Sequence, residues 1–196
     1  EYGKYMDKYF KANDYLLASV KGNTPRTIAG IITSRDCIKK CTFCFRVMGE
    51  TVNEPLTSDS GKTVSYRIRS LDNVFEEINY LVDKYKINEL GLMDDMFAAR
   101  PSRVIEFSER IAPYNLMWNC QLRASSAREK VLPIMKESGC WQIAYGFESG
   151  SPKVLKSMLK GTTIKHISDA IELTKKYKMN VWGNFIYGDP AEDLDT

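Results

Sequence analysis

The chain has 196 residues, and 28 Lys and Arg against 25 Asp and Glu leave a formal net charge of +3. These charges are spread without a basic or acidic block, which argues against a nucleic-acid-binding surface and against a disordered acidic tail. With 43% hydrophobic and 27% charged residues, the composition is that of one ordinary globular domain. No apolar run approaches the ~18 residues that span a bilayer, and no signal-peptide core stands at the start, so we expect a cytoplasmic protein.

The chain opens with a segment whose structure its pattern does not reveal. Residues 1–27 alternate aromatic and charged residues without a clear period, and we interpret them as a lead-in or linker. The β-branched run 27–33 predicts a first strand, and a long loop with three cysteines follows it. A helix comes next, because apolar side chains recur at i, i+4, i+7, i+8 and i+11 from Val74, and Ser70 is its predicted N-cap.

Strands and helices then alternate to the end of the sequence. Further strands are predicted over 89–94, 116–122, 141–147 and 180–187, and further helices over 102–112, over 127–138, from Ser151 and over 164–174. Pro133 predicts a kink or a late start in the helix over 127–138, and Gly139 ends that helix. Apolar strands joined by helices indicate a parallel sheet. Since no Gly-rich phosphate turn follows the first strand, we predict an α/β fold over 28–196, a partial (β/α) barrel rather than a doubly wound sheet.

In either arrangement, functional side chains gather at the carboxyl ends of the strands. This rule selects the cysteine loop, Asp94 and Asp95, Arg123, residues 148–151 and residues 188–192. Arg123 and Glu148 also share the alternation of the polar residues on their strands, so both side chains are expected to point into the barrel lumen. The sequence therefore predicts that these positions converge on one site.

The cysteine loop has the spacing C-x3-C-x2-C, formed by Cys37, Cys41 and Cys44. A structural zinc site wants four ligands, whereas the two other cysteines and the single histidine stand on distant elements. Three thiolates without a fourth protein ligand are better suited to a 4Fe-4S cluster with one open iron. Cys120 and Cys140 are expected to be buried small hydrophobes, and nothing indicates a secreted disulfide framework.

The loop segment TSRDCIKKCTFCFR, residues 33–46, resembles the cluster loop of the radical S-adenosylmethionine (SAM) superfamily. Four later segments resemble the strand-end motifs of that superfamily, in the same order: ELGLMDDMF, WNCQLRA, IAYGFESGS and NFIYGDPAE. The combination of SRxC, CFR, YRIRS and DDMF is most similar to members that carry an upstream cobalamin-binding domain. Asp36 and Ile38 stand where relatives often have Gly and Pro, without any change to a cluster ligand.

The resemblance implies a partial (β/α)6 barrel in which Cys37, Cys41 and Cys44 bind three irons of a 4Fe-4S cluster and SAM chelates the fourth. Reductive cleavage of SAM would give a 5′-deoxyadenosyl radical that abstracts hydrogen from a substrate, and cobalamin-linked members commonly transfer a methyl group. The implied activity is methylation or a related modification of a small molecule, lipid or cofactor precursor. Reduced flavodoxin or ferredoxin is the implied electron donor.

The same resemblance implies which residues contact SAM. They are Phe43, Asp95, Arg123, Glu148, Ser149 and Ile186. Phe43 would pack against the adenine, and the competing interpretation is that it only packs within the fold. The planar guanidinium of Arg123 matches a carboxylate, and the competing interpretation is a surface ion pair. The superfamily has a Gly-Gly-Glu-type motif after the second strand where this sequence has Met-Asp-Asp-Met. Which of Asp94 and Asp95 faces SAM stays open, because adjacent strand residues point to opposite sides.

Two other functions remain open: an RNA-modifying radical SAM enzyme of the methylthiotransferase kind, which the low net charge weakens, and a metal-stapled binding module without chemistry. No Asp-x-His-x-x-Gly segment is present to ligate cobalt, so any cobalamin is expected to be bound outside this chain. The repeats stop after the fifth strand, whereas a (β/α)6 barrel needs a sixth. We therefore expect the sixth strand to lie beyond residue 196 and the fifth strand to have an unpaired edge.

Overall fold

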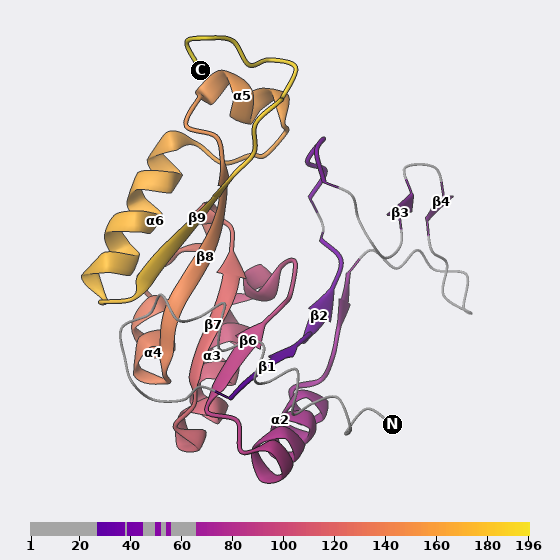
Figure 1. Cartoon of the computed structure of the whole chain (residues 1–196), viewed down its shortest axis with the longest axis vertical. Coiled ribbons are helices and arrows are strands. Elements are labelled where there is room, and N and C mark those ends of the chain that lie inside the picture. The colour runs from indigo at the N-terminus through magenta and orange to yellow at the C-terminus, as the bar shows by residue number, and fades with distance from the viewer. Residues whose placement is uncertain (1–26, 38, 45–49, 52–53, 56–65) are drawn as a thin grey trace.

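The computed structural model describes residues 27–37, 39–44, 50–51, 54–55 and 66–196, so the predicted lead-in lies outside the described residues apart from Thr27. Its main feature is a five-stranded sheet in the order β1-β6-β7-β8-β9, in which every neighbouring pair is parallel (Figure 1). The strands are β1 (Ile28–Ile31), β6 (Glu89–Leu92), β7 (Met117–Leu122), β8 (Cys140–Glu148) and β9 (Asn180–Phe185). The sheet is open, with β1 and β9 at its edges, which confirms the predicted partial barrel.

Helices alternate with these strands along the chain. They are α2 (Leu71–Tyr85), α3 (Pro101–Ile111), α4 (Leu132–Glu137), α5 (Pro152–Ser157) and α6 (Ile164–Lys176), with short 3₁₀ turns η1 (Phe97–Ala99), η2 (Ala112–Tyr114) and η3 (Ala124–Ser126). Two small antiparallel ladders complete the described elements: β2 (Ser34–Arg35) with β5 (Arg67–Ile68), and β3 (Glu50–Thr51) with β4 (Glu54–Pro55). In the described part of the chain, no helix is long and apolar enough to cross a membrane.

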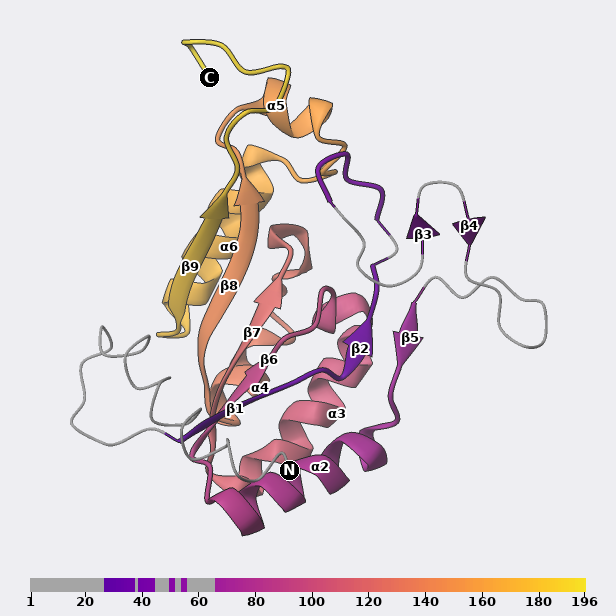
Figure 2. The same cartoon turned by 45° about the vertical axis from the view of Figure 1, so that its right-hand side comes forward.

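The hydrophobic core lies between the sheet and the helices α2, α3, α4 and α6, which cover one of its faces (Figure 2). β7 shows the division between the two faces, because Trp118 and Cys120 are buried in the core while Gln121, which points to the other face, is exposed. The Phe107 ring packs edge-on against Trp118 at 5.4 Å and against Phe97 at 5.3 Å between centroids. Each such pair adds about 0.5–1.5 kcal/mol to the free energy of area burial. On the other face of β7, Asn119 and Gln121 lie beside Met117.

Two of the helix starts are set by the residues predicted from the sequence. The Ser70 side chain accepts a hydrogen bond from the Asn73 backbone N–H at 3.2 Å and caps α2. The Ser151 side chain accepts from the Val154 N–H at 3.5 Å and caps α5, with Pro152 in the first turn where its missing N–H is not needed. These caps confirm both predicted starts.

The fourth helix starts late, which is one of the two outcomes that Pro133 predicted. α4 begins at Leu132 rather than near residue 127, and Pro133 occupies its first turn. A proline there loses no helical hydrogen bond, whereas inside a helix that began at 127 it would remove one, so the late start is the outcome that occurs. Gly139 follows α4 with φ +100°, and a Cβ on it would lie 2.2 Å from the Leu116 carbonyl oxygen. Only glycine fits this turn.

The predicted first strand is too long. β1 ends at Ile31, and the chain then leaves the sheet, so that Ser34 and Arg35 pair with Ile68 and Arg67 in the β2–β5 ladder. This ladder was not predicted, because a strand of two residues is too short to show an alternation of polar and apolar side chains. The cysteine loop follows directly after β2.

Candidate active site

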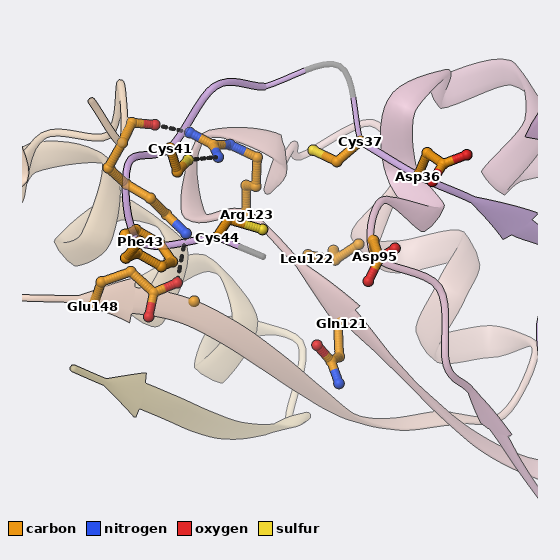
Figure 3. A pocket seen from close by; sticks show the side chains of 12 residues that line it. Asp36, Cys37, Cys41, Phe43, Cys44, Asp95, Gln121, Leu122, Arg123 and Glu148 are labelled. Carbon is orange, nitrogen blue, oxygen red and sulfur yellow. Dashed lines mark hydrogen bonds and ion pairs between the residues drawn. The ribbon is translucent and has the colours of Figure 1, made fainter. Parts of the chain in front are cut away.

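The three cysteines of the loop line one pocket at the carboxyl end of the sheet (Figure 3). Cys37 and Cys41 are half-buried, Cys44 is exposed, and none of the three forms a disulfide. The complete lining is Asp36, Cys37, Cys41, Phe43, Cys44, Asp95, Gln121, Leu122, Arg123, Gly146, Glu148 and Lys160. In the described part of the chain, no three His, Cys, Asp or Glu side chains are grouped as a site for a single metal ion would be. Three thiols spread around a shared pocket suit a larger cluster with several metal atoms.

A buried aspartate at the end of β6 holds the stem of the cysteine loop, which is formed by Thr33 and Ser34. The Asp94 carboxylate accepts hydrogen bonds from the Thr33 N–H, the Thr33 hydroxyl and the Ser34 hydroxyl, each at 2.6 Å. Asp94 is only 1% exposed, whereas the neighbouring Asp95 is exposed and lines the pocket. Of the two carboxylates left open by the sequence, Asp95 is therefore the one at the pocket, and its contact with SAM stays a prediction.

The far end of the loop is attached to α5. The Thr42 N–H donates to the Met158 carbonyl oxygen at 3.1 Å, and the Thr42 hydroxyl donates to the Ser157 carbonyl oxygen at 3.4 Å. The Cys44 N–H also donates back to the Cys41 carbonyl oxygen at 3.2 Å, which closes a turn within the loop. The loop is thus held at Thr33 and Ser34 and again at Thr42, with Cys37 and Cys41 between these anchors and Cys44 two residues beyond the second.

The first residue of the loop has an unusual backbone. Asp36 has φ +73°, in the left-handed region that favours glycine. Its buried carboxylate forms an ion pair with the Arg67 guanidinium at 3.2 Å, across the β2–β5 ladder. On the same side of the pocket, the Cys37 sulfur lies 3.6 Å from the Met96 sulfur, and the Tyr66 hydroxyl donates to the Met96 carbonyl oxygen at 2.7 Å. Burial raises the pKa of Tyr66, so this hydroxyl keeps its proton and its donor role.

Arg123 lies at the end of β7 with its guanidinium in the pocket. One terminal nitrogen is 3.7 Å from the Cys41 sulfur, and the other donates to the Lys160 carbonyl oxygen and lies 3.5 Å from the Thr162 hydroxyl. The side chain is buried, and its Nε has no hydrogen-bond partner among the described residues. The competing interpretation as a surface ion pair does not fit these contacts. An unsatisfied donor on a buried cation is suited to an anionic group of a ligand.

Glu148 faces the same pocket from the end of β8, where the register with β9 shifts and its own φ is +65°. Its carboxylate forms an ion pair with the Lys160 ammonium at 2.6 Å. Both side chains are buried, with the Glu148 side chain 9% exposed and the Lys160 side chain 7% exposed. The Lys160 ammonium also lies 5.6 Å from the centre of the Phe43 ring. A Cβ on Gly146 would come within 2.4 Å of the Glu148 carboxylate and 2.9 Å of the Lys160 ammonium. Gly146 therefore makes room for the ion pair.

Lys160 and Gly146 are site residues that the sequence analysis missed. Lys160 follows a short helix rather than a strand, so the rule that selects strand ends does not reach it. Ser149 and Ile186 were predicted for the site but do not line the pocket. The Ser149 hydroxyl accepts from the Ser151 N–H at 3.0 Å, and the Ile186 N–H donates to the Glu148 carbonyl oxygen at 2.9 Å. Their contact with SAM stays a prediction.

The remaining candidate ligands lie apart from the pocket. Cys120 and Cys140 are buried in the core, and burial raises the pKa of the Cys120 thiol well above its usual range. The His166 ring nitrogen accepts from the Thr163 N–H at 3.2 Å, and the Thr163 hydroxyl accepts from the His166 N–H at 3.2 Å, so this histidine caps α6. Neither cysteine nor the histidine adds a fourth protein ligand to the loop.

The model of the radical SAM superfamily matches residues 31–196. The chain is 34% identical over 164 residues to an uncharacterised methyltransferase of Pyrococcus horikoshii, a match that covers 83% of this chain and 33% of that protein. It is 29% identical over 188 residues to cytidylyl-2-hydroxyethylphosphonate methyltransferase of Streptomyces wedmorensis, covering 94% of this chain and 32% of that protein.

Among solved structures, the fold is similar to the radical SAM methyltransferase TsrM from Kitasatospora setae with cobalamin and a [4Fe-4S] cluster bound. The TM-score is 0.71 at 17% identity, over 90% of this chain and 36% of that one. The chain thus spans about a third of the length of the proteins it matches. A family model that extends over most of the sequence, and three thiols at the pocket where its motifs predict them, show that the chain belongs to the radical SAM superfamily, whose enzymes use a 4Fe-4S cluster and SAM.

Proposed function

We propose that this chain is the catalytic core of a radical SAM methyltransferase that acts on a small molecule, a lipid or a cofactor precursor. The observation that carries the proposal is the pocket in which the thiols of Cys37, Cys41 and Cys44 face Arg123 and Glu148. Methyl transfer is supported by the names of both curated relatives, and a role for cobalamin by the bound cofactors of the solved neighbour. Cobalamin would be bound by a part of the protein outside these 196 residues.

The residues of the pocket divide into those that hold the cluster and those that bind SAM. Cys37, Cys41 and Cys44 would hold the cluster, which supplies the electron for reductive cleavage of SAM when both are bound. The free Nε of Arg123 suits the SAM carboxylate, because a guanidinium offers donors in a planar fork. Glu148 would accept from the SAM ammonium or from a ribose hydroxyl.

The two ends of the pocket differ in charge. Figure 3 shows Asp36 and Asp95 toward one end and Arg123 with Glu148 toward the other, with Cys37 and Cys44 between them. A ligand such as SAM, which carries a carboxylate, an ammonium and a sulfonium, meets charges of both signs in such a pocket. Phe43, next to Cys44 and exposed at 36%, offers an apolar ring for the adenine.

Two partners follow from this chemistry. The cluster needs an external reductant, for which reduced flavodoxin or ferredoxin in the cytoplasm is the proposed source. The substrate is proposed to be a small molecule rather than RNA, because a net charge of +3 without a basic block provides little attraction for a polyanion.

Anaerobic reconstitution of the protein tests the proposal. We expect about four irons and four sulfides per chain, and we expect the reduced protein to convert SAM to 5′-deoxyadenosine. Replacing Cys37, Cys41 or Cys44 with Ala is expected to abolish both, because each substitution removes one of three ligands. Cys120→Ala is the matched control, since loss of this buried thiol is expected to lower the stability by only about 1–3 kcal/mol.

The outcomes separate radical SAM chemistry from methyl transfer. A single zinc per chain, or SAM cleavage that survives the loss of a loop cysteine, would contradict the radical SAM site itself. Visible absorption of bound cobalamin in the full-length protein supports the methyltransferase assignment. A full-length protein that cleaves SAM but binds no cobalamin keeps the radical chemistry and loses the proposed methyl transfer.

A further inference from the structure

We propose that Lys160 is a positioning residue of the SAM site: its ammonium holds the Glu148 carboxylate, and its backbone carbonyl holds the Arg123 guanidinium. This inference rests on the proposed function, because the ligand that the pair would receive is SAM. It adds a residue that lies outside the strand-end motifs of the superfamily and that acts through two other side chains.

Lys160 makes contacts from both its side chain and its backbone. Its ammonium lies 2.6 Å from Glu148 Oε1 and 5.6 Å from the centre of the Phe43 ring, and its carbonyl oxygen accepts from Arg123 Nη2. The residue is 6% exposed. Burying a lysine ammonium costs free energy that only a close counter-charge offsets, so this lysine and Glu148 depend on each other.

The backbone around Lys160 is shaped to turn this residue into the pocket. Leu159 has φ +49° and Gly161 has φ +64°, so left-handed residues stand on both sides of it. The Lys160 N–H donates to the Leu155 carbonyl oxygen at 3.2 Å, and this hydrogen bond closes the C-terminal turn of α5. Leu159 is 61% exposed, so its own packing does not explain a conformation that is unfavourable for leucine. The left-handed residue belongs to the turn that ends α5, and this turn leaves the Lys160 side chain in the pocket.

The consequence for a ligand is a fixed pair of complementary groups. Glu148 Oε1 and Arg123 Nη2 are both held by Lys160, whereas the Arg123 Nε has no partner among the described residues. No described residue donates a hydrogen bond to Glu148 Oε2. One donor and one acceptor, each fixed from the same residue, match the carboxylate and ammonium of the amino-acid part of SAM. Lys160 thereby sets the spacing of two groups on neighbouring strands.

Three substitutions at this position separate charge from hydrogen bonding. Lys160→Met removes both, Lys160→Gln keeps a donor toward Glu148 without the charge, and Lys160→Arg keeps the charge. The matched control is Lys156→Met, which removes an exposed lysine from α5, the helix that precedes Lys160. The readouts are the dissociation constant of SAM by calorimetry, the iron content and the thermal unfolding midpoint of the anaerobically reconstituted protein.

We expect Lys160→Met to weaken SAM binding at least about tenfold while the iron content stays that of the parent, because the lost pairing leaves a buried carboxylate unpaired. Lys160→Arg is expected to recover most of the affinity, and Lys156→Met to bind SAM as the parent does. If Lys160→Met loses iron or does not fold, Lys160→Gln decides, with the same expected loss of affinity at parental iron content.

Parental SAM affinity in a folded, iron-loaded Lys160→Met or Lys160→Gln would overturn the inference. So would a Lys160→Arg variant that binds SAM as weakly as Lys160→Met, because charge would then not be the reason. If the parent itself takes up no cluster or binds no SAM, the proposed function fails and this inference falls with it. The variants, each compared with a SAM-binding parent, test Lys160 alone.

Discussion

The Arg123 side chain contacts several parts of the pocket at once and keeps one donor without a partner among the described residues. Its guanidinium reaches the Cys41 sulfur in the cysteine loop, and the Lys160 carbonyl oxygen and the Thr162 hydroxyl in the segment between α5 and α6. Five N–H donors in a rigid plane allow these contacts at the same time, and still leave Nε unpaired. A flexible ammonium carries three donors on one atom and does not reach three separated acceptors.

Arg123→Lys is therefore expected to weaken SAM binding by about tenfold or more, which is about 1.4 kcal/mol or more. The substitution keeps the positive charge, so the loss would reflect geometry. Calorimetric titration with SAM measures it, and Arg128→Lys, at an exposed position beyond the same strand, is the matched control. Parental SAM affinity in the Arg123→Lys variant would show that Arg123 supports the fold only.

The sequence predicted Arg123 as a residue of the site but did not predict Lys160. Arg123 ends a strand with polar residues at alternate positions, and both facts are visible in the sequence. Lys160 enters the pocket because Leu159 and Gly161 adopt left-handed conformations, and Gly146 on another strand leaves the space for it. A leucine in such a conformation has no local signal, so the position of Lys160 depends on tertiary structure.

The cysteine loop is an element whose shape depends on what holds its ends. Asp94 receives three hydrogen bonds from the stem, and the Thr42 backbone joins the far part to the end of α5. The described residues of the loop after β2 form no helix or strand. Its thiols therefore stay around the pocket only as long as the anchors hold.

Asp94→Asn is expected to loosen the stem, because one oxygen of the carboxylate is replaced by a donor that faces two hydroxyls. The expected cost is about 1–3 kcal/mol of stability for buried groups left unpaired, and with it a lower iron content after reconstitution. Thermal unfolding and iron analysis measure the two effects. Asp95→Asn is the control, since this exposed side chain lines the pocket and holds no part of the stem. Equal iron content in both variants would mean that Asp94 does not position the loop.

Most elements of the fold were predictable because their signals are local. Ser70 and Ser151 mark helix starts by their own side chains, and the strands of the sheet are apolar runs bounded by breakers. The start of α4 and the β2–β5 ladder were not, since Pro133 permits two outcomes and a ladder of two residues a side has no period. For β2, the contacts of Thr33 and Ser34 with Asp94 are tertiary, and the local sequence carries no signal for them.

The molecule as a whole is an open sheet with helices on one face. β1 and β9 form its two edges in the described part of the chain, so the backbone donors and acceptors on the outer side of β9 have no neighbouring strand there. Large side chains also stand exposed along and just after this strand: Trp182 at 58%, Phe185 at 53% and Tyr187 at 86%. An apolar, unpaired edge strand is a surface to which another strand readily adds.

The 196-residue chain on its own is therefore expected to self-associate through β9, in proportion to its concentration. Trp182→Lys is expected to reduce this association, because a charge on the edge opposes the addition of a second strand. Tyr80→Lys, a comparable exposed aromatic on α2 at 51%, is the control and is expected to leave the association unchanged. Sedimentation velocity over a concentration series measures all three proteins. A parent chain that stays monomeric throughout would show that the edge is covered, and equal effects of the two substitutions would show that net charge rather than β9 governs the association.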